Sequence, residues 1–158
     1  MQIREYDAAR DREAVRNCYI QLQDFERSLD PRLPPGERIA DASLEEMFTH
    51  CREFDGSVLV AEWNGEVVGF VAVWTRYRSL EPEDDPTVHA YVSDLVVSSS
   101  HRRRGIGRAL LEAAEEKARA ARCPYVRLSV KAGNQGAISL YAEAGFREWE
   151  LYLEKRLT

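Results

Sequence analysis

The segment from Val88 to Leu110 constrains the fold most, because a run rich in β-branched residues leads through a short polar turn into a helix start. That start reads Arg-Arg-Arg-Gly-Ile-Gly, from Arg102 to Gly107. The first peptide N–H groups of a helix lack partners within the helix and carry the positive end of its dipole, so they bind phosphates well. Gly105 and Gly107 lack side chains that would hold a ligand away from the backbone. The segment therefore predicts a strand, a turn and a helix whose start binds a diphosphate.

Other phosphate-binding motifs do not fit this spacing. The dinucleotide fingerprint GxGxxG requires glycine at position 110, where the chain has Leu110, and the Gly-Lys-Ser/Thr sequence of a P-loop is absent. Taken alone, the three arginines also fit a solvated basic turn that caps an ordinary helix. A second motif, further along the chain, favours the diphosphate interpretation.

That second motif completes a resemblance to a known family. It reads Asn134-x-x-Ala137-Ile138-x-x-Tyr141-x-x-x-Gly145-Phe146, about 30 residues after Arg102-x-x-Gly105-x-Gly107, which itself follows Asp94-Leu95-Val96-Val97. Both motifs in this order, with a strand pattern between them, resemble the GNAT superfamily of acetyl-CoA-dependent N-acetyltransferases. The resemblance is strongest over residues 88–147, and the order of elements upstream agrees with it.

Hydrophobic periodicity and turn signals predict the elements along the chain. Strands are expected at 2–6, 58–63, 66–74, 88–97 and 125–130, with a strand pair or one broken strand from Phe146 onward. Helices are expected after Asp7 or Asp11, from a capping box at Ser43, and at 105–121 and 135–144. The resemblance implies that these elements form one α+β domain over residues 1–158. Its sheet would be twisted, mixed and mostly antiparallel, flanked by about four helices and splayed between the strands at 88–97 and 125–130.

Size and composition limit the function classes. A chain of 158 residues, 44% of them hydrophobic, suits one domain with its own core. The net charge of −5 argues against nucleic acid as a partner, because neutralising phosphates needs a basic face. Three widely spaced cysteines and three scattered histidines suggest neither a disulfide framework nor a metal site. With no apolar signal-peptide core and no apolar run of membrane-spanning length, the chain is expected in the cytoplasm, away from membranes.

The resemblance implies acetyl-CoA as co-substrate and assigns residues to it. The residues whose backbone would take the diphosphate are Arg102, Arg103, Arg104, Gly105, Ile106 and Gly107. The stretch Leu95, Val96 and Val97 would pair with the pantetheine amides like an added strand. A backbone N–H near Val96 or Val97 would also polarise the thioester oxygen. The Asn134 side chain would hold the pantetheine or cap its helix, and these two roles are compatible.

The same resemblance assigns Tyr141 to protonation of the departing CoA thiolate, although a tyrosine at this position also fits a plain core role. Asp94 is the obvious carboxylate for removing a proton from the amine. Many family members carry glutamate one position earlier, where this chain has Ser93. A water relay from Glu62 therefore stays open, as does a structural role for Asp94 at a strand bulge. Strict alternation along the strand would place Asp94 on the face of Val92 and Val96, but the resemblance implies a bulge near here, which leaves the face open.

The acceptor is expected to be a primary amine of a small cationic molecule. An acidic lip formed by Glu81, Glu83, Asp84 and Asp85 would attract it, and the aromatic residues Trp74, Tyr77 and Tyr91 would line its pocket. The alternatives are a protein or peptide N-acetyltransferase and a non-catalytic acyl-CoA-binding sensor. Family members commonly pair through C-terminal strands, so the alternating segment 150–157 suggests a homodimer, although it equally fits an edge strand of a monomer.

Overall fold

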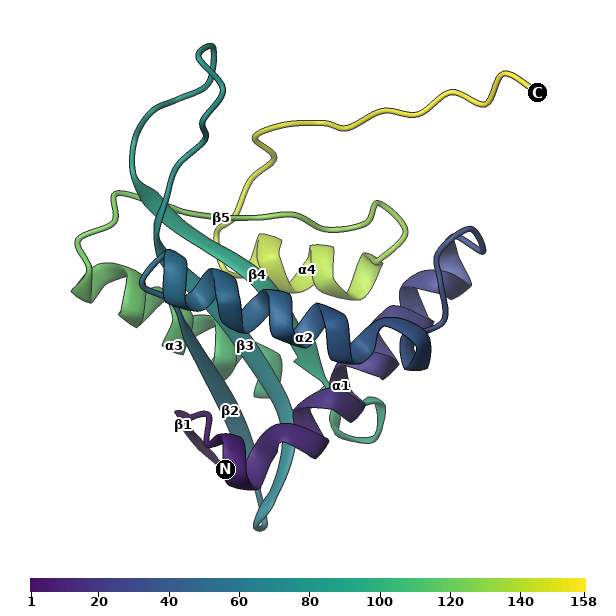
Figure 1. Ribbon diagram of the computed structural model, residues 1–158, viewed down its shortest axis with the longest axis vertical. Helices are drawn as coiled ribbons and strands as arrows, with labels where there is room; N and C mark the ends of the chain where they lie inside the picture. The colour runs from purple at the N-terminus through teal and green to yellow at the C-terminus, as the bar shows by residue number, and fades with distance from the viewer.

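A five-stranded sheet forms the frame of the computed structural model, which describes all 158 residues (Figure 1). Its strands lie side by side in chain order and are β1 (Gln2–Glu5), β2 (Ser57–Trp63), β3 (Glu66–Tyr77), β4 (His89–Val97) and β5 (Val126–Leu128). β1 to β4 pair antiparallel, and β5 pairs parallel to β4. The expected mixed, mostly antiparallel sheet is therefore confirmed. The Asn64-Gly65 turn joins β2 to β3 with both residues at positive φ, as a tight hairpin requires.

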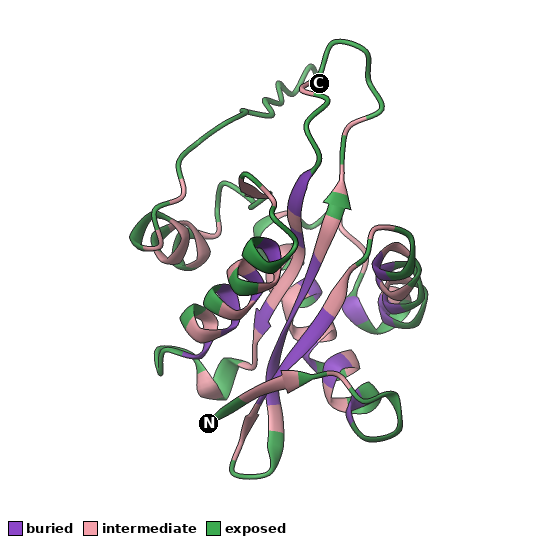
Figure 2. Ribbon diagram, turned by 90° about the vertical axis from the view of Figure 1, so that its left-hand side faces the viewer, coloured by how far each residue is buried: buried purple, intermediate pink, exposed green.

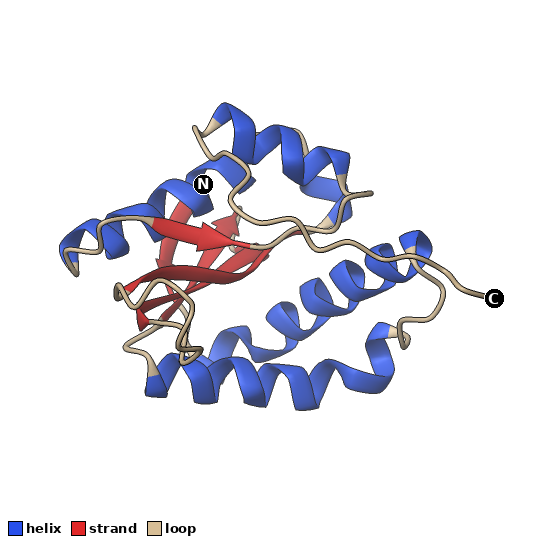
Figure 3. Cartoon of the chain, turned by 90° about the horizontal axis from the view of Figure 1, so that it is seen from above, coloured by secondary structure: helices blue, strands red, loops and turns tan.

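Four helices cover the two faces of the sheet (Figure 3). They are α1 (Ala8–Leu29), α2 (Gly36–Glu53), α3 (Ile106–Ala120) and α4 (Gln135–Glu143). α1 and α2 lie on one face, and α3 and α4 lie on the other. Each face has its own apolar core: Leu110 and Ala114 pack against the sheet on the α3 side, and Val15 and Leu44 on the opposite side. Figure 2 shows buried residues along the central strands and on the inner sides of α1, α2 and α3.

The start of α2 corrects the sequence prediction. The helix begins at Gly36, and Ser43 lies inside it rather than at its N-cap. A Cβ at Gly36 would lie 2.7 Å from the carbonyl oxygen of Ile20, so glycine is what lets α2 approach α1 so closely. The Gly36 N–H donates to Asp24 Oδ1 at 2.7 Å. A side chain from the preceding helix thus does the work expected of a local capping box. α1 begins as expected, with Asp7 accepting from the Ala9 N–H.

The sheet opens between β4 and β5. Parallel pairing runs only from Ala90 with Val126 to Val92 with Leu128. On its other side β4 stays paired with β3 as far as Val97. The part of β4 after Val92 therefore has one edge of main-chain N–H and C=O groups without a strand beside it. This confirms the splayed sheet that the resemblance implies.

A bulge at Ser93 coincides with this opening. Ala72 pairs with Asp94 and Val73 with Val92, which leaves Ser93 without a partner on β3. As a result Val92 belongs to the core on the α3 side, whereas Val96 belongs to the core beside α1 and α2. Asp94 shares the second face with Ala72. Strict alternation was therefore correct in placing Asp94 on the face of Val96 and wrong in placing it on the face of Val92, because the extra residue at Ser93 reverses the pattern between Val92 and Asp94.

The C-terminal segment also differs from the sequence prediction. Residues 145–158 contain no strand, and β5 is shorter than expected. The segment runs outward from the body of the protein (Figure 1), with Trp149 69% and Tyr152 100% exposed. One ion pair, from Arg32 to Glu154 at 2.9 Å, ties it to the turn after α1. Alternating hydrophobicity predicted a strand here, but the segment pairs with no strand of its own chain, and the outer edge of β5 stays free.

Candidate active site

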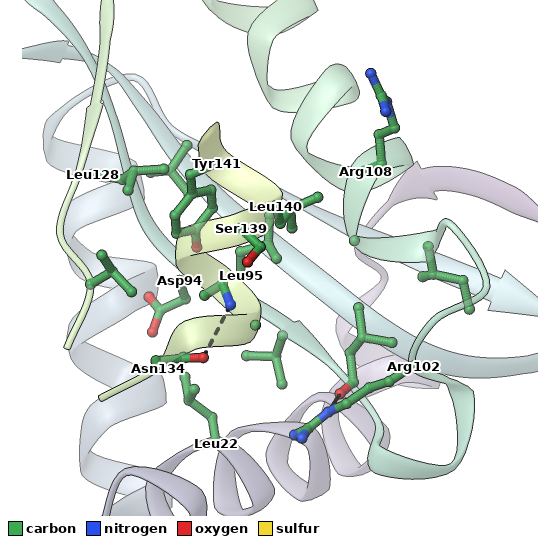
Figure 4. A pocket seen from close by; sticks show the side chains of 18 of the residues that line it. Leu22, Asp94, Leu95, Arg102, Arg108, Leu128, Asn134, Ser139, Leu140 and Tyr141 are labelled. Carbon is green, nitrogen blue, oxygen red and sulfur yellow. Dashed lines mark hydrogen bonds between the residues drawn. The ribbon is translucent and has the colours of Figure 1, made fainter. Parts of the chain in front are cut away.

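A cavity of about 680 Å³ fills the opening between β4 and β5 (Figure 4). Its walls come from β4, the start of α3, the segment after β5, one face of α4 and the last turns of α1. The expected site residues that line it are Asp94, Leu95, Val96, Val97, Arg102, Arg103, Gly105, Ile106, Gly107, Asn134 and Tyr141. Segments far apart in the sequence thus meet where the sheet parts.

The start of α3 forms one end of the cavity. Gly105 occupies the N-cap position at φ 78°, a left-handed conformation that favours glycine, and a Cβ there would face open space. At Gly107 a Cβ would lie 3.2 Å from Leu140 of α4, so the absent side chain keeps the gap between the helices open. Unpaired N–H groups of the first helical turn therefore face a space that a diphosphate can enter.

The three arginines before α3 divide into two groups. The Arg102 Nε donates to the Val97 carbonyl oxygen at 3.2 Å, and its guanidinium lies over the Phe25 ring of α1. Arg103 also lines the cavity. Arg104 does not: its guanidinium lies over the Trp63 ring, 5.7 Å from the ring centre. The side chain of Arg104 therefore packs on β2, whereas the prediction for Arg104 concerned its backbone.

Two basic residues at this end were not among the predicted site residues. His101 and Arg108 both line the cavity. The Arg108 guanidinium points away from the cavity in Figure 4 and donates to Glu112 one turn further along α3, at 3.2 Å. His101 follows the polar turn directly before the arginines, and its place next to the motif was the available signal.

α4 contributes Asn134 and Tyr141. Asn134 caps the helix, its Oδ1 accepting from the Ala137 N–H at 3.2 Å, as expected (Figure 4). Tyr141 points into the space that Asp94 also faces. Burial raises the pKa of Tyr141 to about 12, and the charges of Asp94 and Glu26 add to this effect. The phenol therefore keeps its proton throughout the neutral range and can act only as a donor there.

Asp94 lies at the bulge, half-buried, on the wall of the cavity. Its carboxylate accepts one hydrogen bond, from Ser93 Oγ at 2.8 Å. Burial raises the pKa of Asp94 above its ordinary value, the Ser93 bond lowers it, and the charges of Glu26 and Glu46 raise it further. A carboxylate with a raised pKa is a better proton acceptor near neutral pH than an ordinary aspartate.

Glu62 cannot take this role in the way the sequence left open. It lies on β2 outside the cavity and is bound by Arg4 at 2.8 Å and by Arg10 at 3.5 Å. Arg4 also pairs with the buried Asp11. Through these ion pairs Glu62 has a structural role, because they connect β2 to β1 and α1.

The expected acidic lip does not form at the cavity. Glu81, Glu83, Asp84 and Asp85 belong to the loop between β3 and β4, which projects beyond the sheet (Figure 1). None of the four lines the cavity. Asp85 instead accepts from the Tyr125 hydroxyl and pairs with Arg127 at 3.1 Å. These charges hold the loop against the start of β5.

The three expected aromatic residues cluster close to the bulge. The Trp74 and Tyr91 rings stack 5.2 Å apart on the face of the sheet that also carries Asp94, and Tyr77 packs against both. The Tyr91 hydroxyl lies 3.1 Å from Ser129 Oγ, across the opening. The cluster borders the cavity without lining it.

The structure contains no group of three or more His, Cys, Asp or Glu side chains placed to hold a metal ion. None of its helices has the length and apolarity that crossing a membrane requires.

Comparison with known proteins identifies the class of protein that this fold and site define. The acetyltransferase (GNAT) family model matches residues 19–146, which is most of the chain. The chain therefore belongs to the GNAT family of acetyltransferases.

Relatives within the family act on different substrates. An N-alpha-acetyltransferase of Sulfurisphaera tokodaii is 33% identical over 102 residues, covering 63% of this chain and 61% of that protein. An L-2,4-diaminobutyric acid acetyltransferase of Nocardia farcinica is 28% identical over 117 residues, covering 73% of this chain and 57% of that protein. The matches thus span less than two thirds of the length of these curated relatives.

Solved structures agree on the fold. A tetramutant of the BH1408 protein of Bacillus halodurans superposes with a TM-score of 0.81 at 21% identity, over 99% of this chain and 100% of that one. A ribosomal-protein-alanine N-acetyltransferase of Brucella melitensis superposes with a TM-score of 0.70 at 25% identity, over 95% of this chain and 86% of that one. The whole chain, including the segments outside the family match, therefore follows a GNAT architecture.

Gly107→Glu should abolish binding of CoA. A carboxylate here would put bulk and negative charge where the diphosphate is expected. The diphosphate would then lose its charge-assisted hydrogen bonds to the protein, which should weaken the affinity for CoA by about 100-fold or more. Titration calorimetry with CoA measures this. The control is Ala120→Glu, which adds the same charge at the exposed far end of α3. Unchanged CoA affinity in a folded Gly107→Glu protein would remove the start of α3 from the site.

Proposed function

We propose that this protein transfers the acetyl group of acetyl-CoA directly to a primary amine of a small cationic molecule. One observation carries the proposal: a single cavity joins the start of α3, the unpaired edge of β4, and the side chains of Asp94 and Tyr141. Family membership supports acetyl transfer as the reaction class. The choice of acetyl-CoA over other acyl-CoA donors and the choice of acceptor are parts of the proposal.

The residues present suit acetyl-CoA as co-substrate. The N–H groups at Gly105, Ile106 and Gly107, with the nearby charges of Arg102 and Arg103, suit a diphosphate. The unpaired edge of Leu95 to Val97 suits the amides of an extended pantetheine arm. The arm would lie beside β4 like an added strand, beyond the point where pairing with β5 ends. Bound acetyl-CoA would supply an acetyl thioester and leave as the free thiol.

Asp94 is proposed as the base. An alkylammonium ion has a pKa near 10.4, so only about one molecule in two thousand is neutral at pH 7 and able to attack a thioester. Asp94, with its raised pKa, would accept the proton directly or through one water. A main-chain N–H at Val96 or Val97 is proposed to stabilise the negative charge that develops on the acetyl oxygen.

Tyr141 is proposed as the donor to the departing sulfur. Its pKa of about 12 lies well above that of a thiol, so complete transfer of the phenol proton would be uphill. A hydrogen bond that strengthens as charge builds on sulfur avoids this difficulty. Placement of Tyr141 and Asp94 in one cavity also argues against a sensor without chemistry.

A peptide N-terminus is the second candidate acceptor. The observation in its favour is the 33% identity to an N-alpha-acetyltransferase. A peptide bound by its N-terminus would have to leave the cavity, and its following residues would lie outside. Turnover with short peptides, compared with small amines, distinguishes the two acceptors.

Location and assembly complete the proposal. We place the protein in the cytoplasm, because all three cysteines are free and acetyl-CoA is the proposed donor. We also propose a homodimer in which the exposed apolar residues of 149–157 pair with the outer edge of β5 in a second copy. Light scattering tests this, and a monomer at assay concentration would contradict it.

Tyr141→Phe should lower kcat by about 10- to 100-fold while leaving CoA affinity unchanged, because only the hydrogen bond to sulfur is lost. Thiol release from acetyl-CoA, measured against a panel of polyamines, amino acids, aminoglycosides and peptides, provides the assay. Tyr152→Phe, in the fully exposed tail, is the matched control. An unaltered rate would exclude Tyr141 from the reaction, and no release with any amine would contradict the transferase itself.

Asp94→Asn should change the pH profile of kcat/KM. A base works only when it has lost its proton, so the wild-type rate should rise with pH through the raised pKa of Asp94. In the variant this rising limb of the pH profile should disappear and the rate should fall by about 100-fold. Only the rise that follows deprotonation of the acceptor's ammonium group should remain. Glu62→Gln should keep the limb. A limb that survives in Asp94→Asn would place the base elsewhere.

A further inference from the structure

Glu26 is an unusual residue on the face of α1 that borders the cavity. The neighbouring residues on this face, Leu22 and Phe25, line the cavity with apolar atoms, and Figure 4 shows Leu22 projecting from α1 at the edge of the cavity. Glu26 follows one helical turn after Leu22 and lines the same cavity, half-buried. Its carboxylate is therefore placed at the wall of the proposed site and not on the outer surface of the helix.

No basic side chain forms an ion pair with Glu26. Elsewhere on α1, Asp11 pairs with Arg4 at 2.6 Å, and Asp24 accepts from the Gly36 N–H. Glu26 feels only the attraction of the exposed Lys131, which is too weak to offset burial, so its pKa is raised. A carboxylate that loses hydration without gaining a partner costs stability, which a bound cation would restore.

A second unpaired carboxylate faces the same space. Asp94 lies across the cavity from α1 and receives only the Ser93 hydroxyl. The charges of Glu26 and Asp94 both raise the pKa of the Tyr141 phenol. The charges of Glu26 and of Glu46 on α2 both raise the pKa of Asp94. None of these carboxylates forms an ion pair, and the cation that acts on Glu26, Lys131, is exposed, so this part of the cavity carries at least two negative charges without an ion-pair partner.

We propose that Glu26 binds a second ammonium group of the acceptor while Asp94 receives the proton of the amine that is acetylated. The preferred acceptors are then diamines and other molecules with two ammonium groups, rather than monoamines. This inference rests on the proposed function and adds a specificity residue to it. One carboxylate on α1 and one on β4, both lining the same cavity, can bind two cations at once, which selects for the length of the molecule as well as for its charge.

The test compares acceptors that differ only in the second charge. Initial rates of acetyl-CoA-dependent acetylation are measured with α,ω-diaminoalkanes of increasing length and with amino alcohols of equal length. The wild type should favour the diamine of the best length by about tenfold or more in kcat/KM, because a charge-assisted hydrogen bond contributes at that scale. Glu26→Gln should remove most of this preference, mainly by raising KM for the diamine.

Glu13→Gln is the matched control, since it removes the same charge from an exposed position on the same helix. It should leave the preference for the diamine intact. Equal loss of rate for diamine and amino alcohol in Glu26→Gln, or an equal effect of Glu13→Gln, would overturn the proposal. A wild type that acetylates both acceptors equally would overturn it too, while supporting the transferase. A wild type that acetylates neither would instead count against the proposed function.

Discussion

The hydrogen-bonded ladder between β4 and β5 ends after Val92, and the rest of the site depends on that interruption. In a continuous sheet the main-chain groups of Leu95 to Val97 on the edge away from β3 would be hydrogen-bonded to the neighbouring strand. Here they face a cavity instead. Main-chain groups need partners, so an edge held open inside a fold is prepared for an extended ligand. α3 and α4 hold the two sides of the opening apart, with Gly107 at their closest approach.

The cavity is also polarised in charge. Arg102, Arg103 and the start of α3 line one part of the cavity, whereas Asp94 of β4 and Glu26 of α1 line it with carboxylates that form no ion pair. A negative diphosphate and a positive amine would thus be drawn to different parts of one space. The overall charge of −5 conveys nothing of this separation. The charges of the projecting loop, by contrast, are partly used up locally, as the contact of Asp85 with Arg127 shows.

Local signals in the sequence were sufficient for the order of elements along the chain as far as α4, the hairpin at Asn64-Gly65 and the start of α3, because each depends on neighbouring residues, whereas the mixed, splayed sheet was implied by the family resemblance. Features set by distant residues were missed. The start of α2 depends on Asp24 and Ile20 of the preceding helix, and the direction of Arg104 depends on Trp63 of β2. Glu26 escaped notice because a glutamate on an amphipathic helix ordinarily faces water. Only the position of α1 against the opened sheet places its carboxylate at the cavity.

The bulge at Ser93 separates two properties of β4 that usually go together. Removing one residue there would leave Val92 facing α3 and Asp94 facing α1, so both apolar cores would keep their side chains. It would, however, straighten the strand at the point where pairing with β5 stops. Ser93 belongs to neither apolar core, whereas its bulge coincides with the opening of the sheet. A β4 without this residue would therefore keep both apolar cores but leave no room for a ligand between β4 and β5.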